Sequence, residues 1–129
     1  MVEIAKFEAA HIDGIVRLCA EEGWPSWTPE SVATAFAAPG VIALTALSEG
    51  NVVGAAQLLT DGRVVAYLGL LIVNPRFRGR GIGRALVGEL FERSGLTRMD
   101  LLSEADSTAF YESLPHKVKP GYRIYRQTR

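Results

Sequence analysis

The chain has 129 residues, 48% of them hydrophobic and 22% charged, which is typical of one folded domain with a substantial core and excludes a disordered chain. Lysine plus arginine and aspartate plus glutamate number 14 each, so the overall charge gives no reason to expect nucleic acid or an anionic membrane as a partner. No repeat or linker interrupts the sequence, and we expect a single domain over residues 1–129. A lone cysteine, no apolar stretch near the ~20 residues of a membrane span and no signal-peptide pattern together predict a cytoplasmic protein.

The first half of the chain predicts a strand, two helices and two further strands. Apolar residues recur at helical spacing between Ile12 and Cys19, which indicates an amphipathic helix that buries the cysteine as an inert small residue. Thr28 followed by Pro29 is typical of a helix start, because the hydroxyl caps the first amides and proline fits the first turn. The expected ranges are a strand at 2–7, helices beginning near 12 and 28, and strands at 41–47 and 52–59.

The second half predicts two helices and the remaining strands. The pair Asp61-Gly62 indicates a tight hairpin leading into a strand over 64–73. Nearly every residue of that strand is apolar, so we expect it to be the central strand, buried on both faces. The other expected elements are a helix at 82–93, a strand at 98–102, a helix ending at 114, and one or two edge strands within 117–126. A strand-helix-strand unit inside a mainly antiparallel sheet indicates a mixed α+β fold.

An arginine- and glycine-rich loop joins the strand that ends near Val73 to the helix that follows. Residues 76–84 include four arginines and three glycines, and no acidic residue occurs between Gly62 and Gly88. A helix N-terminus offers unpaired amides and partial positive charge, glycines let the main chain approach an anion closely, and arginine binds phosphate in a bidentate manner. The loop therefore predicts a phosphate-binding site.

Other anion-binding patterns fit this loop less well. The dinucleotide fingerprint requires a third glycine where Arg84 stands, and the nucleoside-triphosphate loop requires a Gly-Lys-Ser/Thr tripeptide that does not occur in the chain. An RNA- or DNA-binding arginine cluster would need an aromatic platform or a second basic patch, and neither is evident. A glycine-rich turn with merely solvated arginines is the structural alternative.

At this point the residues carry a family resemblance. The stretch Val73-Asn74-Pro75-Arg76-Phe77-Arg78-Gly79-Arg80-Gly81-Ile82-Gly83-Arg84-Ala85-Leu86 resembles motif A of the GNAT N-acetyltransferases. That motif has arginine or glutamine, two residues, glycine, any residue, then glycine or alanine; here these positions are Arg78, Gly81 and Gly83. Residues 109–114 resemble the family's Phe-Tyr motif, and the element order agrees over essentially the whole chain. The resemblance implies a GNAT-like acyl-CoA N-acyltransferase fold, with a central, mainly antiparallel sheet flanked by helices.

The resemblance also implies how the chain binds acetyl-CoA, the acyl donor. Backbone groups at the end of the long apolar strand would pair with the pantetheine arm like an added strand, and the amides of the loop would hold the pyrophosphate. The strands that contain Val73 and Leu101 splay apart in this family, and Gly69 is a candidate bulge that helps the splay. The implied cofactor-binding residues are Leu71, Ile72, Val73, Arg78, Gly79, Arg80, Gly81, Ile82, Gly83 and Arg84. No metal is implied.

Tyr111 is the candidate catalytic residue, a general acid for the departing thiolate. A phenol is protonated at neutral pH, although a core aromatic residue would give the same letter. A backbone N–H near Ile72 is the candidate oxyanion donor. The general base is not evident, because residues 66–71 contain no acid where many family members place one. A water chain, an acceptor of low pKa or His116 remain alternatives, with His11 a weaker one.

The expected activity is transfer of an acetyl group from acetyl-CoA to the primary amine of a small molecule. Trp24 and Trp27 flank Pro25 in a loop that resembles the acceptor-side lid of this fold, although packing aromatics would look the same. No acidic run indicates a polyamine or a basic protein as the acceptor. The alternative is a non-catalytic acyl-CoA-binding module, suggested by the missing carboxylate. No nucleic-acid or membrane partner is expected, and frequent dimers in this family leave a homodimer open.

Overall fold

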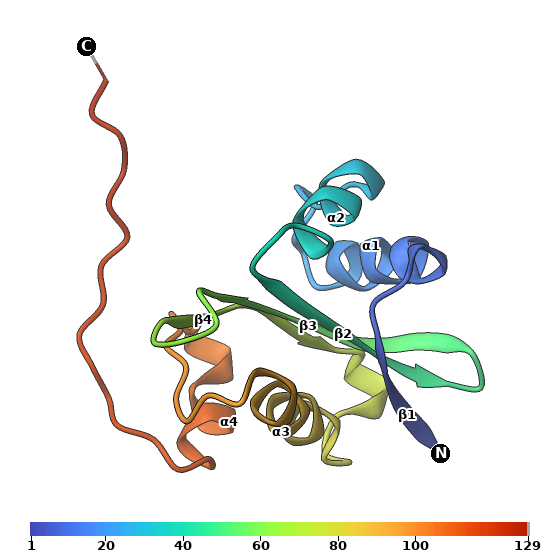
Figure 1. Ribbon diagram of the computed structural model, residues 1–129. Coiled ribbons are helices and arrows are strands. Elements are labelled where there is room, and N and C mark those ends of the chain that lie inside the picture. The colour runs from blue at the N-terminus through green and yellow to red at the C-terminus, as the bar shows by residue number, and fades with distance from the viewer. Residues whose placement is uncertain (129) are drawn as a thin grey trace.

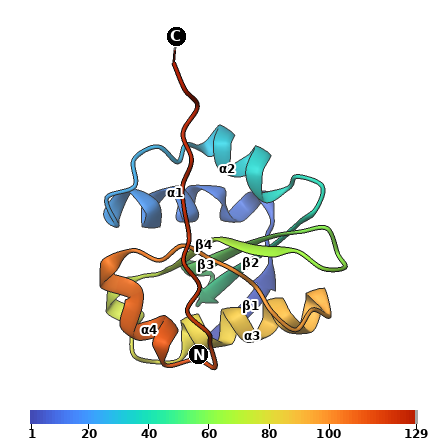
Figure 2. The same cartoon turned by 90° about the vertical axis from the view of Figure 1, so that its left-hand side faces the viewer.

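The computed structural model describes residues 1–128 and has the predicted mixed α+β fold (Figure 1). Four strands form one antiparallel sheet in the order β1-β2-β3-β4. Helices α1 and α2 lie on one side of the sheet, and α3 and α4 lie on the other (Figures 1 and 2). The strands are β1 (Val2–Lys6), β2 (Val41–Ser48), β3 (Asn51–Thr60) and β4 (Ala66–Val73). The helices are α1 (Ile12–Glu21), α2 (Pro29–Phe36), α3 (Ile82–Ser94) and α4 (Thr108–Glu112), with 3-10 turns at Ala9–His11, Pro75–Phe77 and Ala105–Ser107.

The first two helices form where the sequence predicts them, and the apolar face of α1 is buried. Thr28 caps α2 as expected: its Oγ1 accepts from the Ser31 amide at 3.1 Å, and the Thr28 amide donates to Ser31 Oγ at 2.8 Å. Between these helices and the sheet lies one core cluster, made of Ile15, Leu18, Cys19, Val32, Phe36, Ala43, Ala55, Leu70 and Ile72. The apolar residues whose spacing predicted the helix therefore form the face that packs on the sheet.

A second core cluster lies between α3 and the opposite face of the sheet. Helix α3 contributes Ile82, Leu86 and Leu90, which recur at helical spacing and are almost fully buried. The strands contribute Leu44, Ala46, Val53, Ala56, Leu58, Ala66 and Leu68. Within residues 1–128, no helix combines the length and the apolar character that crossing a membrane requires.

Strand β4 lies at the edge of the sheet, so the expectation that it is the central strand is wrong. Its apolar character on both faces has another cause. Gln57 pairs with Leu70 and Leu58 pairs with Leu68, which leaves Gly69 unpaired in a bulge. The bulge turns Leu68 toward the α3 cluster and Leu70 toward the α1–α2 cluster. Because helices cover both faces, β4 carries apolar side chains on both, while its outer edge pairs with no strand beyond Leu68.

The strand expected at 98–102 is reduced to a single parallel bridge between Asp100 and Tyr67. The Leu68 amide donates to the Asp100 carbonyl, and the Asp100 amide donates to the Ala66 carbonyl, each at 2.9 Å. Pairing stops where the bulge at Gly69 bends β4 away. The two segments therefore part at the bulge, which agrees with the splay that the family resemblance implied.

The edge strands expected within 117–126 are also absent from the structure. These residues run as an exposed, extended tail that forms no strand (Figures 1 and 2), and the tail passes close to the side chain of Leu102 at Gly121. The alternation around Tyr122 and Ile124 is typical of a strand, but a strand forms only where a partner edge offers a ladder of hydrogen bonds. Here the segment at 98–102 bonds through Asp100 alone, so it offers the tail no continuous edge.

Candidate active site

A cleft of about 980 Å³ opens along the free edge of β4. Its walls are β4, the glycine-rich loop with the start of α3, the residues from Leu102 into helix α4, the segment 22–27 between α1 and α2, and Arg123 of the C-terminal tail. Of the residues predicted to bind the cofactor or to act in catalysis, all except Arg80 line this cleft. Residues from distant parts of the sequence therefore meet where the sheet stops pairing.

The backbone of β4 presents alternate residues to the cleft. The Asn74 amide donates to the Val53 carbonyl at 2.8 Å, and Val73 lies opposite Gly54 in the register. Because hydrogen-bonded and non-bonded pairs alternate in an antiparallel ladder, Val73 and Leu71 turn their polar groups to the open edge, and Ile72 turns its own toward β3. The amides at the open edge next to Ile72 are therefore those of Leu71 and Val73, which become the two candidate oxyanion donors.

Two glycines in the loop have backbone conformations that other residues rarely adopt. Gly79 has φ of +78° and Gly81, the N-cap of α3, has φ of +82°. A side chain at either position would meet no atom within 4 Å, so the space in front of this backbone is open. The first amides of α3 have no carbonyl within their own helix to bond. Open space beside unpaired amides at a helix N-terminus is the arrangement that binds phosphate.

The third glycine of the loop has a packing role. A Cβ on Gly83 would lie 3.0 Å from the Phe110 ring, so its absence lets α4 approach the start of α3. Arg84 donates from Nη2 to the Ser113 carbonyl at 3.2 Å and to Ser113 Oγ at 3.4 Å. The start of α3 and the α4 region are thus joined by two separate contacts.

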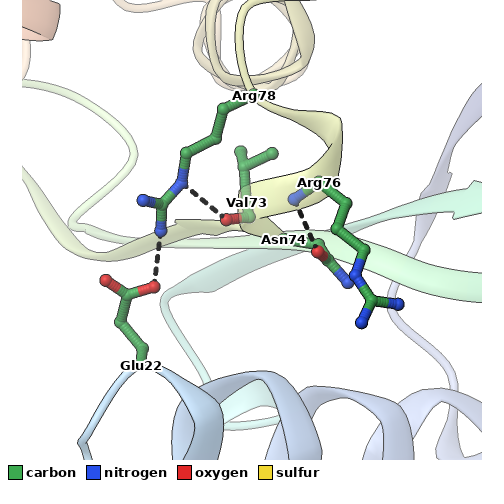
Figure 3. A network of polar contacts seen from close by, with 5 residues as sticks. All are labelled: Glu22, Val73, Asn74, Arg76 and Arg78. Carbon is green, nitrogen blue, oxygen red and sulfur yellow. Dashed lines mark hydrogen bonds and ion pairs between the residues drawn. The ribbon is translucent and has the colours of Figure 1, made fainter.

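Arg78 and Arg80 of the loop also contact protein groups. The Arg80 guanidinium lies 4.8 Å from the centre of the Phe77 ring, outside the cleft lining. Arg78 bonds Glu22 and the Val73 carbonyl, as Figure 3 shows. Asn74 Oδ1 accepts from the Arg76 amide at 2.9 Å and holds the turn that begins the loop. A phosphate would therefore meet arginines that the fold has already oriented.

Tyr111 lines the cleft from α4 and packs against the α3 core cluster. Its ring meets Phe110 edge-on with centroids 5.1 Å apart. Burial raises the pKa of the Tyr111 phenol, because a phenolate loses solvation in apolar surroundings. The hydroxyl consequently keeps its proton well above neutral pH, as a general acid must.

The histidines and the cysteine lie outside the cleft lining. His116 is exposed and its Nδ1 lies 2.8 Å from the Leu114 carbonyl, whereas His11 is buried and accepts from the Glu8 amide at 3.1 Å. Burial, and next the charge of Glu22, raise the pKa of the Cys19 thiol to about 11. Within residues 1–128, no group of three or more His, Cys, Asp or Glu side chains is placed to hold a metal ion.

The structure adds carboxylates that sequence reasoning missed. Glu22, Glu104 and Asp106 line the cleft, together with Trp24 and Trp27 from the segment 22–27. A search for an acid on β4 could not find them, because they come from the end of α1 and from the turn before α4. Their positions in the sequence could have indicated them, because Glu22 stands two residues before Trp24 and the other two stand shortly before the Phe-Tyr motif at 109–114.

The sequence model of the acetyltransferase (GNAT) family matches residues 10–114. The chain belongs to the GNAT acetyltransferase family. The matched range contains β4, the glycine-rich loop and Tyr111, and every residue that lines the cleft except Arg123. The expected family and fold are confirmed.

Individual relatives agree with this assignment. The chain is 36% identical over 87 residues to the glucosamine 6-phosphate N-acetyltransferase of Trypanosoma brucei brucei, covering 60% of this chain and 55% of that protein. It is 32% identical over 107 residues to the N-alpha-acetyltransferase RimI of Mycobacterium tuberculosis, covering 78% and 68%. The chain spans about half the length of two curated relatives that it matches. The solved structure of AAC(6')-Iy with a CoA bisubstrate analogue has the same fold, with a TM-score of 0.79, 18% identity and 99% of both chains covered.

Proposed function

We propose that this GNAT chain is an N-acetyltransferase that moves an acetyl group from acetyl-CoA to the primary amine of a small molecule. The observation that carries the proposal is the continuous path along one wall of the cleft. The open edge of β4 leads directly into the glycine-rich start of α3, and Tyr111 faces the same cavity from α4. A donor with an amide-bearing arm and a pyrophosphate fits such a path.

The residues present fit coenzyme A as the donor's carrier. Leu71 offers its amide and carbonyl, and Val73 offers its amide, at the spacing of an added strand, which suits the amides of a pantetheine arm. The Val73 carbonyl already accepts from Arg78 Nε. Gly79 and Gly81 leave room for a diphosphate against the α3 N-terminus. The solved relative AAC(6')-Iy, named an aminoglycoside N-acetyltransferase, is described in complex with CoA. We propose the same ligand for this cleft.

The proposed chemistry is direct transfer. The acceptor nitrogen forms a bond to the thioester carbonyl carbon and the carbon–sulfur bond breaks. The Leu71 or the Val73 amide would stabilise the developing oxyanion, and Tyr111 would give its proton to the departing sulfur. The proton lost by the amine passes to water or to a cleft carboxylate, and Glu104 and Asp106 are the candidates. These carboxylates weaken the argument for a non-catalytic module, which rested on the lack of an acid on β4.

A small amine is the proposed acceptor because aromatic and acidic side chains share the cleft. Trp24 and Trp27 offer ring faces, and Glu104 and Asp106 offer negative charge, which together attract an ammonium group. Among the relatives, one is named for an amino sugar phosphate and another for N-alpha-acetylation. A free amino sugar and a peptide N-terminus are therefore the two acceptor types to compare.

The test is release of free thiol from acetyl-CoA across a panel of small amines, amino sugars and short peptides. The proposal predicts turnover with at least one small amine and less with any peptide, and the product should carry the acetyl group on nitrogen. Faster turnover of peptides than of every small amine would contradict the proposed acceptor. Tight binding of acetyl-CoA without turnover of any acceptor would favour the binding module.

A further inference from the structure

An ion pair spans the cleft between the end of α1 and the start of the glycine-rich loop (Figure 3). Arg78 Nη2 lies 2.5 Å from Glu22 Oε1, and Arg78 Nε donates to the Val73 carbonyl at 3.1 Å. The two partners are 56 residues apart in the sequence. Arg78 is therefore joined at once to the last residue of β4 and to the opposite wall of the cleft.

Glu22 begins the segment 22–27 that forms that opposite wall. It is the C-cap of α1, with its amide bonded to the Leu18 carbonyl, and Trp24 follows with its amide bonded to the Cys19 carbonyl at 2.8 Å. Trp24 and Trp27 are the two tryptophans of the chain, and both line the cleft. Glu22 is thus the first residue of the segment that carries this aromatic wall.

Arg78 has donors to spare for a second partner. A guanidinium carries five N–H groups, and Glu22 and Val73 engage two of them. The Arg78 side chain is 51% exposed and that of Glu22 is 20% exposed, so its remaining donors can reach a ligand in the cleft. The residue after Arg78 is Gly79, where the space for an anion opens.

We propose that Glu22 is a positioning residue, which acts through Arg78 to hold the aromatic wall of segment 22–27 in place relative to the cofactor loop. An anion that binds at the loop then shares Arg78 with Glu22, and its arrival is transmitted to Trp24 and Trp27. The identity of that anion, the pyrophosphate of acetyl-CoA, rests on the proposed function. The tie, by which we mean the ion pair of Glu22 with Arg78 that joins segment 22–27 to the loop, rests only on the contacts of Arg78.

The first experiment tests the tie without any ligand. Quenching of tryptophan fluorescence by acrylamide is compared in wild type, Glu22→Gln and the control Glu21→Gln, which makes the same charge change one residue away. Glu22→Gln should raise the quenching constant about 1.5- to 3-fold. Loss of a partly exposed ion pair shifts an equilibrium by a small factor of this order, because such a pair contributes little free energy. Glu21→Gln should leave it unchanged. Equal quenching in all three proteins would overturn the proposal.

A perturbation without mutation guards against a folding defect in Glu22→Gln. Potassium chloride screens exposed ion pairs, and acrylamide is a neutral quencher that salt does not repel. Quenching of the wild type should therefore rise with salt toward the value of Glu22→Gln, and that of Glu22→Gln should stay constant. A wild type whose quenching ignores salt would contradict a tie through this pair.

The second experiment tests the coupling to the cofactor. Coenzyme A is titrated while the tryptophans are excited at the red edge of their absorption, where adenine does not absorb. Wild type should show a saturable fluorescence change, and Glu22→Gln should bind with a Kd within about fivefold but lose most of that change. Arg78→Gln should lose the change and also bind more weakly, and adding Glu22→Gln to it should have no further effect on the fluorescence.

The outcomes separate the two proposals. A protein that binds coenzyme A but acetylates no amine fails the proposed function, while the quenching and titration results still decide the tie. In an active enzyme, Glu22→Gln should raise the KM of the amine about two- to fivefold with little change in the Kd of coenzyme A. If the effects of Glu22→Gln and Arg78→Gln on the fluorescence change simply add in the double mutant, the positioning role is refuted.

Discussion

Replacing Tyr111 by phenylalanine is the sharpest test of the proposed chemistry, because it removes one oxygen and leaves the ring. The ring packs on the α3 cluster and meets Phe110 edge-on, and both contacts survive the change. The stability of the variant should therefore stay within about 1 kcal/mol of wild type, the scale of one hydrogen-bonding group. Affinity for acetyl-CoA should also change little, because the proposed contacts of the donor are backbone groups of β4 and the loop.

The expected loss is in turnover. A positioned general acid contributes roughly 10²- to 10⁴-fold, which corresponds to about 3–5 kcal/mol of transition-state stabilisation. The loss should appear in kcat and not in the Kd of acetyl-CoA, because the proton is needed only as the carbon–sulfur bond breaks. Stopped-flow or steady-state thiol release measures kcat, and a thermal-shift titration measures Kd.

The pH profile gives an independent reading of the same group. Burial raises the pKa of Tyr111 above the ordinary value of about 10, so the phenol stays protonated across the neutral and mildly alkaline range. An alkaline fall in kcat from this residue should lie at higher pH than an ordinary phenol would give, and it should vanish in Tyr111→Phe. A turnover of Tyr111→Phe within a few-fold of wild type would not affect the fold assignment, but it would refute the assignment of Tyr111 as the acid.

Three further predictions address the loop and the core. Gly83→Ala should destabilise the protein, because its Cβ would meet the Phe110 ring at 3.0 Å, whereas the matched Gly88→Ala, with no atom within 4 Å, should stabilise α3 by up to about 1 kcal/mol in chemical denaturation. Gly81→Ala should cost about 1–2 kcal/mol because of its φ of +82°, and should reduce the thermal shift that acetyl-CoA produces; an undiminished shift would place the pyrophosphate elsewhere. Cys19, with a pKa of about 11, should resist alkylation at pH 8 until the protein unfolds, and rapid labelling of the native state would contradict its burial.

The parts of the fold that the sequence predicted are those set by local chemistry. Thr28 caps α2 because its own hydroxyl reaches an amide three residues on, and no distant partner is needed. The glycine-rich loop was recognisable because the positive φ angles at Gly79 and Gly81 require glycine wherever the strand lies. The wrong expectations concern pairing between distant segments. An apolar run such as β4 records that both its faces are covered, but not which neighbours lie in its own plane.

In the site, too, short local motifs could be predicted and contacts between distant segments could not. Loop residues and Tyr111 could be named from short motifs, and the structure brings all of them except Arg80 to one cleft. The contacts of Arg78 could not be foreseen, because Glu22 is far away in the sequence and nothing local requires it to face the loop. The cleft carboxylates Glu104 and Asp106 were missed for a related reason: the search for an acid was confined to β4.

Three contacts around the cleft explain how a small chain could position a donor, an acid and an acceptor together. Gly83 against Phe110 and Arg84 against Ser113 join α4 to the start of α3, so the helix that carries Tyr111 packs against the element that follows the glycine-rich loop. Arg78 against Glu22 fastens the aromatic wall to the same loop. Because all three contacts involve residues between Arg78 and Arg84, the loop is the common support of the cleft. Binding of a pyrophosphate there would fix the acid and the acceptor wall in one event, which is how positioning lowers the barrier to transfer.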